Sequence, residues 1–196
     1  MRNVVGRSLR RGFLTLMLAG LAIPLGCEAE AETMGEVDLV AVVGGDTFIG
    51  VLADDEGVVA YVCDGTDSEV MLAEWFIMEN NGGSFEATNT VATDTGTIDV
   101  SIRGSFGDGT ASGTLTINGQ ASDFEASGSS GDEGTYRAKD NDYLAAWVIV
   151  GDDLRGAVIN RNTGDLFSGG NIQPTSGTFE FMGVSLTPLK LTISDY

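Results

Sequence analysis

From residue 39 onward, short runs of apolar and β-branched residues alternate with clusters of Gly, Asp and Asn. Within 97–102, apolar residues alternate strictly with polar ones, which is typical of a strand with one face in water. Two alternating runs flank Asn118-Gly119, the strongest short-range signal for a β-hairpin. The pattern predicts about ten to twelve short strands. They are drawn from the runs at 39–43, 47–52, 58–63, 75–78, 83–87, 96–103, 112–117, 121–126, 134–138, 143–150, 154–160, 178–182 and 184–191.

One segment departs from this rhythm. Residues 67–74 read Asp-Ser-Glu-Val-Met-Leu-Ala-Glu, in which Ser68 is a residue of the N-cap type and helix formers follow it. The spacing of the apolar positions fits about two helical turns better than a strand. The sequence therefore predicts one short helix near 68–74.

Many short strands, tight turns and almost no helix indicate an all-β domain. We expect a single antiparallel β-barrel, because closure protects the strand edges, with a β-sandwich as the alternative. An integral outer-membrane barrel is disfavoured, because the strands are short and their polar faces lack a lipid-facing band. The domain is expected to span residues 37–196. Pro188 in the last run indicates an edge strand or a bulge.

The first 26 residues have a different character. They contain four arginines and no acidic residue, and residues 13–25 are almost wholly apolar. This apolar stretch is shorter than the about 20 residues that a membrane-spanning helix needs. A basic start followed by a short apolar core predicts a secretory signal peptide over residues 1–26. Arg10-Arg11 leaves export by the twin-arginine route open beside the general route.

The end of this leader indicates how the chain is processed. Gly26-Cys27 resembles a lipobox, although Pro24 stands where such a motif usually has Leu. The pair predicts that Cys27 is lipid-modified and becomes the first residue of the mature protein, with 27–36 as an acidic flexible tether. Ordinary cleavage after Ala31 is the alternative. Glu28 directly after the cysteine favours the outer membrane over the inner one.

Charge limits the choice of partners. Four of the 10 basic residues and none of the 29 acidic residues lie in 1–26, which leaves 6 basic residues against 29 acidic ones. Such a surface repels phosphate backbones, so we expect no nucleic-acid partner. A cationic or protein partner stays open.

Cys63 is the one cysteine after Cys27. It lies in the apolar run 58–63, so a buried strand cysteine that acts as a small hydrophobe is the simplest interpretation. If Cys27 is not lipidated, the two cysteines could instead form a disulfide. The two interpretations exclude each other.

One further sequence pattern covers most of residues 47–160. The segment Tyr61-Val-Cys-Asp-Gly65, a following Trp75, and the later Trp147 and Arg155-Gly156 resemble a pattern in uncharacterised secreted or lipid-anchored bacterial proteins. The resemblance implies a β domain outside the cytoplasm. It implies no activity.

Candidate chemistry is limited, because the chain contains no His. This excludes Ser-His-Asp and Cys-His catalysis and His-based metal sites. We expect no catalytic residue, no cofactor and no metal site. A carboxylate-dependent enzyme on envelope glycans is the alternative, with Glu74 and Glu79 beside Trp75 as its candidate pair.

Two further candidates have a structural interpretation beside the functional one. The oxygen-rich segments 140–142 and 160–165 suit calcium, but their residues are also those of tight turns, which is the interpretation we favour. Aromatic residues could line the mouth of a lipocalin-like barrel that carries a small ligand, or they could form the core, which is more usual at strand positions. These residues are Tyr61, Trp75, Tyr136, Tyr143 and Trp147.

The sequence as a whole favours an envelope lipoprotein whose acidic β domain has a non-enzymatic binding or structural role. The enzyme and the small-ligand carrier are the alternatives.

Overall fold

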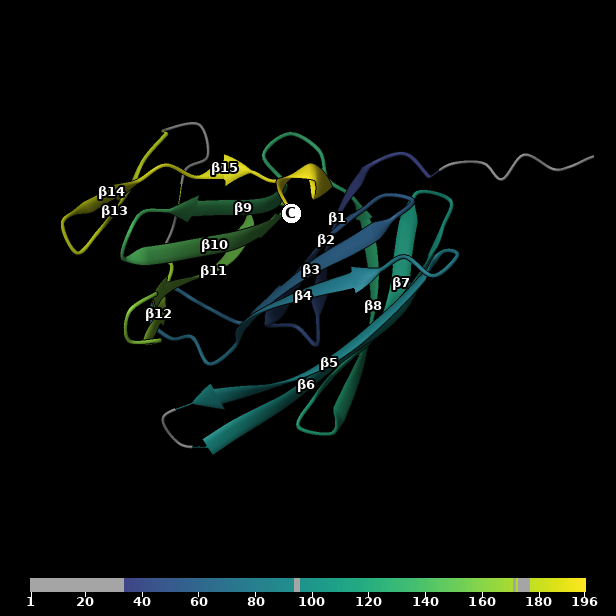
Figure 1. Ribbon diagram of the computed structural model, residues 1–196, viewed down its shortest axis with the longest axis horizontal. Coiled ribbons are helices and arrows are strands. Elements are labelled where there is room, and N and C mark those ends of the chain that lie inside the picture. The colour runs from purple at the N-terminus through teal and green to yellow at the C-terminus, as the bar shows by residue number, and fades with distance from the viewer. Residues whose placement is uncertain (1–33, 94–95, 171, 173–176) are drawn as a thin grey trace, which may run out of the picture. The chain divides into compact units, whose positions relative to one another are not determined.

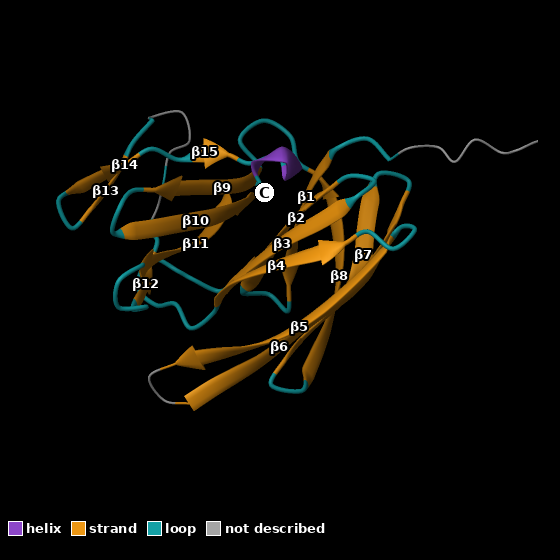
Figure 2. Ribbon diagram, in the orientation of Figure 1, coloured by secondary structure: helices purple, strands orange, loops and turns teal. Residues whose placement is uncertain are grey.

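The computed structural model describes residues 34–93, 96–170, 172 and 177–196. This part is almost entirely β, with a single 3₁₀ turn at Ile193–Asp195 (Figure 2). The strands are β1 Val37–Val43, β2 Thr47–Ala53, β3 Gly57–Cys63, β4 Ala73–Glu79, β5 Ser84–Thr93, β6 Gly96–Gly107, β7 Thr110–Ile117, β8 Gln120–Gly128, β9 Gly134–Lys139, β10 Tyr143–Val150, β11 Asp153–Asn160, β12 Leu166–Ser168, β13 Phe179–Phe181, β14 Val184–Leu186 and β15 Leu189–Lys190. The all-β class is confirmed.

The first eight strands form one antiparallel sheet in the order β4-β3-β2-β1-β8-β7-β6-β5. Its two end strands, β4 and β5, are consecutive in the chain and lie near each other, so the sheet nearly closes into a barrel (Figure 1). No backbone ladder joins β4 to β5, so one edge of each of these two strands is left unpaired. The barrel prediction is confirmed for these eight strands.

Alternation along the strands fills the inside of this sheet with apolar side chains. Leu39, Ile49, Val62, Phe76 and Phe124 belong to the buried cluster there. β2 and β3 differ from β5 to β8, since almost every one of their residues is buried, whereas β5 to β8 alternate between buried and exposed positions. Therefore β2 and β3 have a second cover on their outer face, and β5 to β8 have water on theirs.

That second cover is a five-stranded antiparallel sheet in the order β12-β11-β10-β9-β15. Val40, Phe48 and Tyr61 from the first sheet form a buried cluster with Ala146 and Val148 of β10. The opposite face of the second sheet is covered by the β13–β14 hairpin, through a cluster that contains Trp147, Phe179 and Phe181. The domain thus combines a nearly closed barrel with sandwich-like packing on one side.

The predicted helix near 68–74 is wrong. Residues 64–72 form a loop, and Ala73 and Glu74 already belong to β4, opposite Cys63 and Val62. The Asp64 carboxylate accepts the backbone N–H groups of Met71 and Leu72, at 2.9 and 2.8 Å. Side-chain bonds of this kind compete with the backbone bonds of a helix, which explains the difference.

Three glycines bring distant backbone segments together around Trp147. Gly156 donates its N–H to the Gly65 carbonyl at 3.1 Å, and Gly169 donates to the Gly156 carbonyl at 2.9 Å. The Trp147 indole N–H donates to the Gly169 carbonyl at 3.2 Å. A β-carbon at Gly156 would overlap the Trp147 ring, and one at Gly65 would overlap the Gly156 carbonyl. Only glycine fits these approaches.

Candidate functional site

The predicted leader and Cys27 lie outside the described residues. The first strand begins at Val37. Within 34–93, 96–170, 172 and 177–196, no helix has the length and apolar character needed to cross a membrane.

Cys63 is buried and forms no disulfide with any residue that the structure describes. Its Sγ accepts the Gly65 backbone N–H at 3.2 Å. Burial raises the pKa of the thiol to about 11, which keeps it protonated and unreactive at neutral pH. The geometry fits a small buried hydrophobe.

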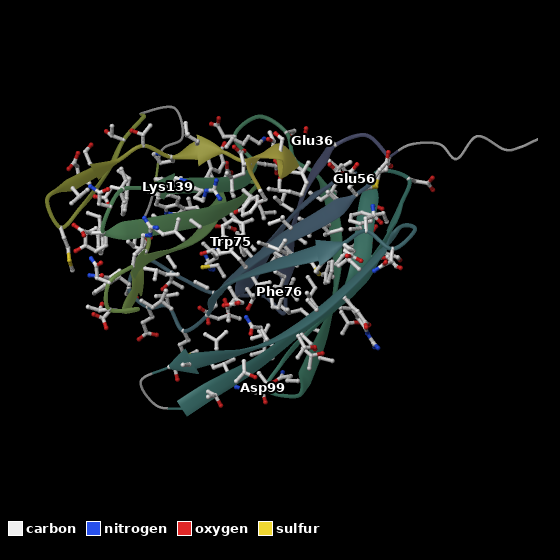
Figure 3. All side chains as sticks on the ribbon, in the orientation of Figure 1. Glu36, Glu56, Trp75, Phe76, Asp99 and Lys139 are labelled. Carbon is white, nitrogen blue, oxygen red and sulfur yellow. The ribbon has the colours of Figure 1, made fainter. Side chains whose placement is uncertain are left out.

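The two candidate catalytic carboxylates do not converge. Residues five apart on a strand point to opposite faces, and Glu74 lies on the same face of β4 as Phe76, whereas Glu79 shares a face with Trp75 and Ile77. Figure 3 shows Trp75 and Phe76 on the two sides of β4. Phe76 belongs to the barrel core, and Trp75 packs beside the clusters on the outer face.

Glu74 instead pairs with an amide. Asn89 Nδ2 on β5 donates to Glu74 Oε1, a side-chain bond between the two end strands of the first sheet. Partial burial raises the pKa of Glu74, and the hydrogen bond from Asn89 opposes this rise. The pair bridges the seam where β4 and β5 lack a ladder.

The structure brings the two calcium candidates together at one end of the second sheet. Asn162 Nδ2 donates to Asp142 Oδ1 at 2.9 Å. However, Asp140 Oδ1 accepts the N–H groups of Asp142 and Tyr143, and Asn160 Oδ1 accepts those of Asn162 and Thr163. These oxygens cap their own turns. In the described part of the chain, no group of three acidic or Cys side chains is placed to hold a metal ion.

The aromatic candidates belong to the packed interior. Trp147, Tyr61 and Tyr136 are almost fully buried, and Tyr143 packs beside Phe181. Trp75 stacks on Tyr61 with ring centroids 4.4 Å apart, and Tyr196 covers it at 5.3 Å. They line no barrel mouth.

A semi-buried ion pair joins the two sheets. Asp38 Oδ2 on β1 accepts the Ser129 hydroxyl at 2.6 Å and lies 3.5 Å from Lys190 Nζ on β15. Asp38 Oδ1 is buried and has no hydrogen-bond partner among the described residues. Burial raises the pKa of this carboxyl, and the bonds from Ser129 and Lys190 only partly oppose the rise.

The uncovered outer face of β5, β6 and β7 carries short polar side chains in register. Glu86 lies opposite Arg103, which lies opposite Thr114, and rows of Ser and Thr flank this row on both sides. The side chains of these flanking rows are Ser84, Ser105 and Ser112 on one side and Thr88, Ser101 and Thr116 on the other. This arrangement makes the outer face of these three strands rich in hydroxyl groups.

This face contains two hollows, of about 490 and 390 Å³. The Ser row lines the larger hollow, and the Thr88–Ser101–Thr116 row lines the smaller one. Glu86 and Arg103 line both, so the hollows are neighbours with these two longer side chains between them. We call the pair of hollows the hydroxyl groove.

Arg103 has no ion pair and no side-chain hydrogen bond to any residue that the structure describes, although Glu86 lies opposite it. Other basic side chains are held by intramolecular contacts. Arg155 donates to the Asp46 carbonyl and lies over the Phe48 ring, and Arg137 lies over the Tyr196 ring. The guanidinium of Arg103 is therefore available to a ligand.

Comparison of the chain with protein-family models, curated proteins and solved structures found no match. The hydroxyl groove was not among the residues that the sequence analysis singled out. One signal was present, the alternation in 97–102, which places Asp99 and Ser101 on one face. The pairing that sets Arg103 between two hydroxyl rows becomes visible only from the strand register.

Proposed function

We propose that the protein is an exported envelope lipoprotein that is anchored through a lipid on Cys27. Its acidic β domain binds a ligand and has no catalytic role. The observation that supports surface binding is the contrast between the two sides of the first sheet. Its inside is filled by a packed apolar cluster, and its hollows lie on the outer face of β5 to β7.

Two separate observations argue against the two alternatives. A lipocalin-like carrier needs an apolar cavity inside the barrel, where this chain has packed side chains. A glycosidase needs two carboxyl groups about 5 to 10 Å apart across a cleft. Glu74 and Glu79 point to opposite faces of β4.

The leader and Gly26-Cys27 support export and acylation, and Glu28 supports the outer membrane as the destination. The large excess of acidic over basic residues in the remaining chain supports a domain that stays in water and off anionic membrane surfaces.

Intact mass and detergent phase partitioning of the protein from its native host test the anchor. We expect a mass that fits residues 27–196 plus a diacylglycerol and an amide-linked acyl chain, and recovery in the detergent phase. Cys27→Ser should keep the leader and lose the lipid, since the thioether can no longer form. Cys63→Ala is the matched control and should partition like the wild type.

A chain cleaved after Ala31, or an unlipidated chain with Cys27 bonded to Cys63, would contradict the anchor. Cleavage of envelope glycans by the purified protein that is lost in Glu74→Gln would contradict the non-catalytic role.

A further inference from the structure

We infer that the hydroxyl groove binds an uncharged oligosaccharide chain, an inference that rests on the proposed binding function and names its ligand class. Two adjoining hollows on one uncovered sheet face, with Glu86 and Arg103 between them, form the site.

The groove is longer than it is wide. From the Ser84 row to the Thr88 row the strands advance by four residues, or about 13 Å at the rise of an antiparallel strand. Across it, β5 to β7 span two strand spacings, about 10 Å. An elongated ligand that runs along the strands contacts both hollows, and a single small molecule fills only one.

The groove offers hydrogen bonds of both kinds. A Ser or Thr hydroxyl donates one hydrogen bond and accepts two, which matches the hydroxyl groups of a sugar. The hydroxyls of Ser105, Ser112 and Thr116 make no hydrogen bond within the described residues, so they can bond to a ligand. Glu86 adds acceptors, and Arg103 adds a planar fork of donors.

Charge selects an uncharged chain over an anionic one. Glu86, Asp123 and Glu125 lie on the same face as Arg103, and the chain as a whole carries 29 acidic residues. Arg103 is the one basic side chain that lines either hollow. A polymer with repeated carboxylate or phosphate groups would meet more repulsion than attraction there.

A protein partner fits this face less well. The centres of protein–protein interfaces are rich in apolar and aromatic side chains, and charged residues are depleted there. The outward side chains of β5, β6 and β7 in the groove are Ser, Thr, Glu and Arg. The aromatic residue at the groove, Phe85, points into the barrel core.

Isothermal titration calorimetry of the full lipidated protein in detergent tests the inference. The probes are cellohexaose, chitohexaose and, as an anionic chain of similar length, hexagalacturonate. We expect saturable binding of at least one neutral hexasaccharide and weaker binding of hexagalacturonate. Arg103→Ala should weaken binding by about tenfold, since it removes a bidentate charged donor. Ser112→Leu, which replaces a hydroxyl in the larger hollow with a bulkier apolar side chain, should weaken it at least as much.

Lys139→Ala is the matched control, because it removes one exposed positive charge from β9, outside the groove, and should bind like the wild type. Absence of binding of both neutral probes, tighter binding of hexagalacturonate, or equal affinities of Arg103→Ala and Lys139→Ala would overturn the inference. These results leave the non-catalytic lipoprotein intact. Recovery of a shortened hexasaccharide would instead overturn the non-catalytic role and leave binding in the groove intact.

Discussion

Gly50 lies where β2 packs closely against β9. A β-carbon at this position would overlap Thr135 Oγ1, so the absence of a side chain permits the close approach of the two sheets. Thr135 is fully buried, and its hydroxyl has no hydrogen-bond partner among the described residues. A buried hydroxyl without a partner costs free energy, so the Thr135 hydroxyl does not stabilise this contact. The contact is held by packing.

We expect Gly50→Ala to lower the free energy of unfolding by about 2 kcal/mol, the usual cost of overpacking a core. In a Thr135→Ala background the same substitution should cost much less, because the atom that it meets is gone. Urea unfolding of the four proteins of this double-mutant cycle measures the coupling. Additive effects of the two substitutions would show that the contact does not limit the sheet approach.

Several residues of the sequence pattern around Tyr61–Gly65 and Trp147–Gly156 meet in space. Gly65 contacts Gly156, and the Tyr61 hydroxyl donates to the Ala146 carbonyl at 3.4 Å. The sequence marks these residues as unusual without showing what they do. Their contacts join segments about 90 residues apart, and no local pattern encodes such a distance.

At the scale of elements, the seam between β4 and β5 makes a testable prediction. Asn89→Ala removes the hydrogen bond that stabilises the ionised form of Glu74, so the pKa of Glu74 should rise further above its usual value. Carbon-detected NMR titration of the Glu74 carboxyl measures the change. Thr88→Ala, on the opposite face of β5, is the control and should leave the titration unchanged. A constant or lowered pKa in Asn89→Ala would contradict the bridge.

Most strands could be predicted from the sequence, because each combines alternation or a β-branched run with a strong turn. Asn118 and Gly119 adopt φ values of 50° and 80°, as a tight hairpin with this pair requires. Pro188 lies between β14 and β15, and β15 is an edge strand of the second sheet.

The elements that the sequence did not predict have physical reasons. β12 has three residues, too few for a period, and the second half of β5 is rich in Thr and Asn, which weakens the alternation. The segment near 68–74 has the composition of a helix, but tertiary contacts override it. Leu72 is buried in the barrel core, and the Asp64 carboxylate accepts the backbone N–H groups of Met71 and Leu72.

At the scale of the whole domain, the burial of Asp38 makes folding depend on pH. The pKa of Asp38 is raised in the folded protein, so the folded state binds this proton more tightly than the unfolded state. Its contribution to stability is present below the unfolded value of about 4 and is lost as pH rises through the raised value. Asp38→Asn should remove this component.

Urea unfolding of the wild type and Asp38→Asn between pH 4 and 7 measures the difference. We expect the wild type to lose stability relative to the variant as pH rises. Lys190→Met should steepen the loss, because Lys190 lowers the pKa of Asp38. A constant difference between wild type and Asp38→Asn across this range would contradict the assignment.

The barrel could be predicted from the sequence, but its asymmetry could not. The continuous apolar runs of β2 and β3 indicate burial on both faces, and the alternation of 97–102 indicates one wet face, yet neither shows which strands are neighbours. The groove depends on that order, since its rows come from three strands in register.

The long β5–β6 hairpin gives the domain a direction. Figure 1 shows the end of this hairpin where β5 stops and β6 begins far from the start of β1. In the proposed lipoprotein the anchor precedes β1 in the chain, so the distant end of this hairpin would be the first part of the domain to meet large, slowly diffusing polymers of the cell envelope.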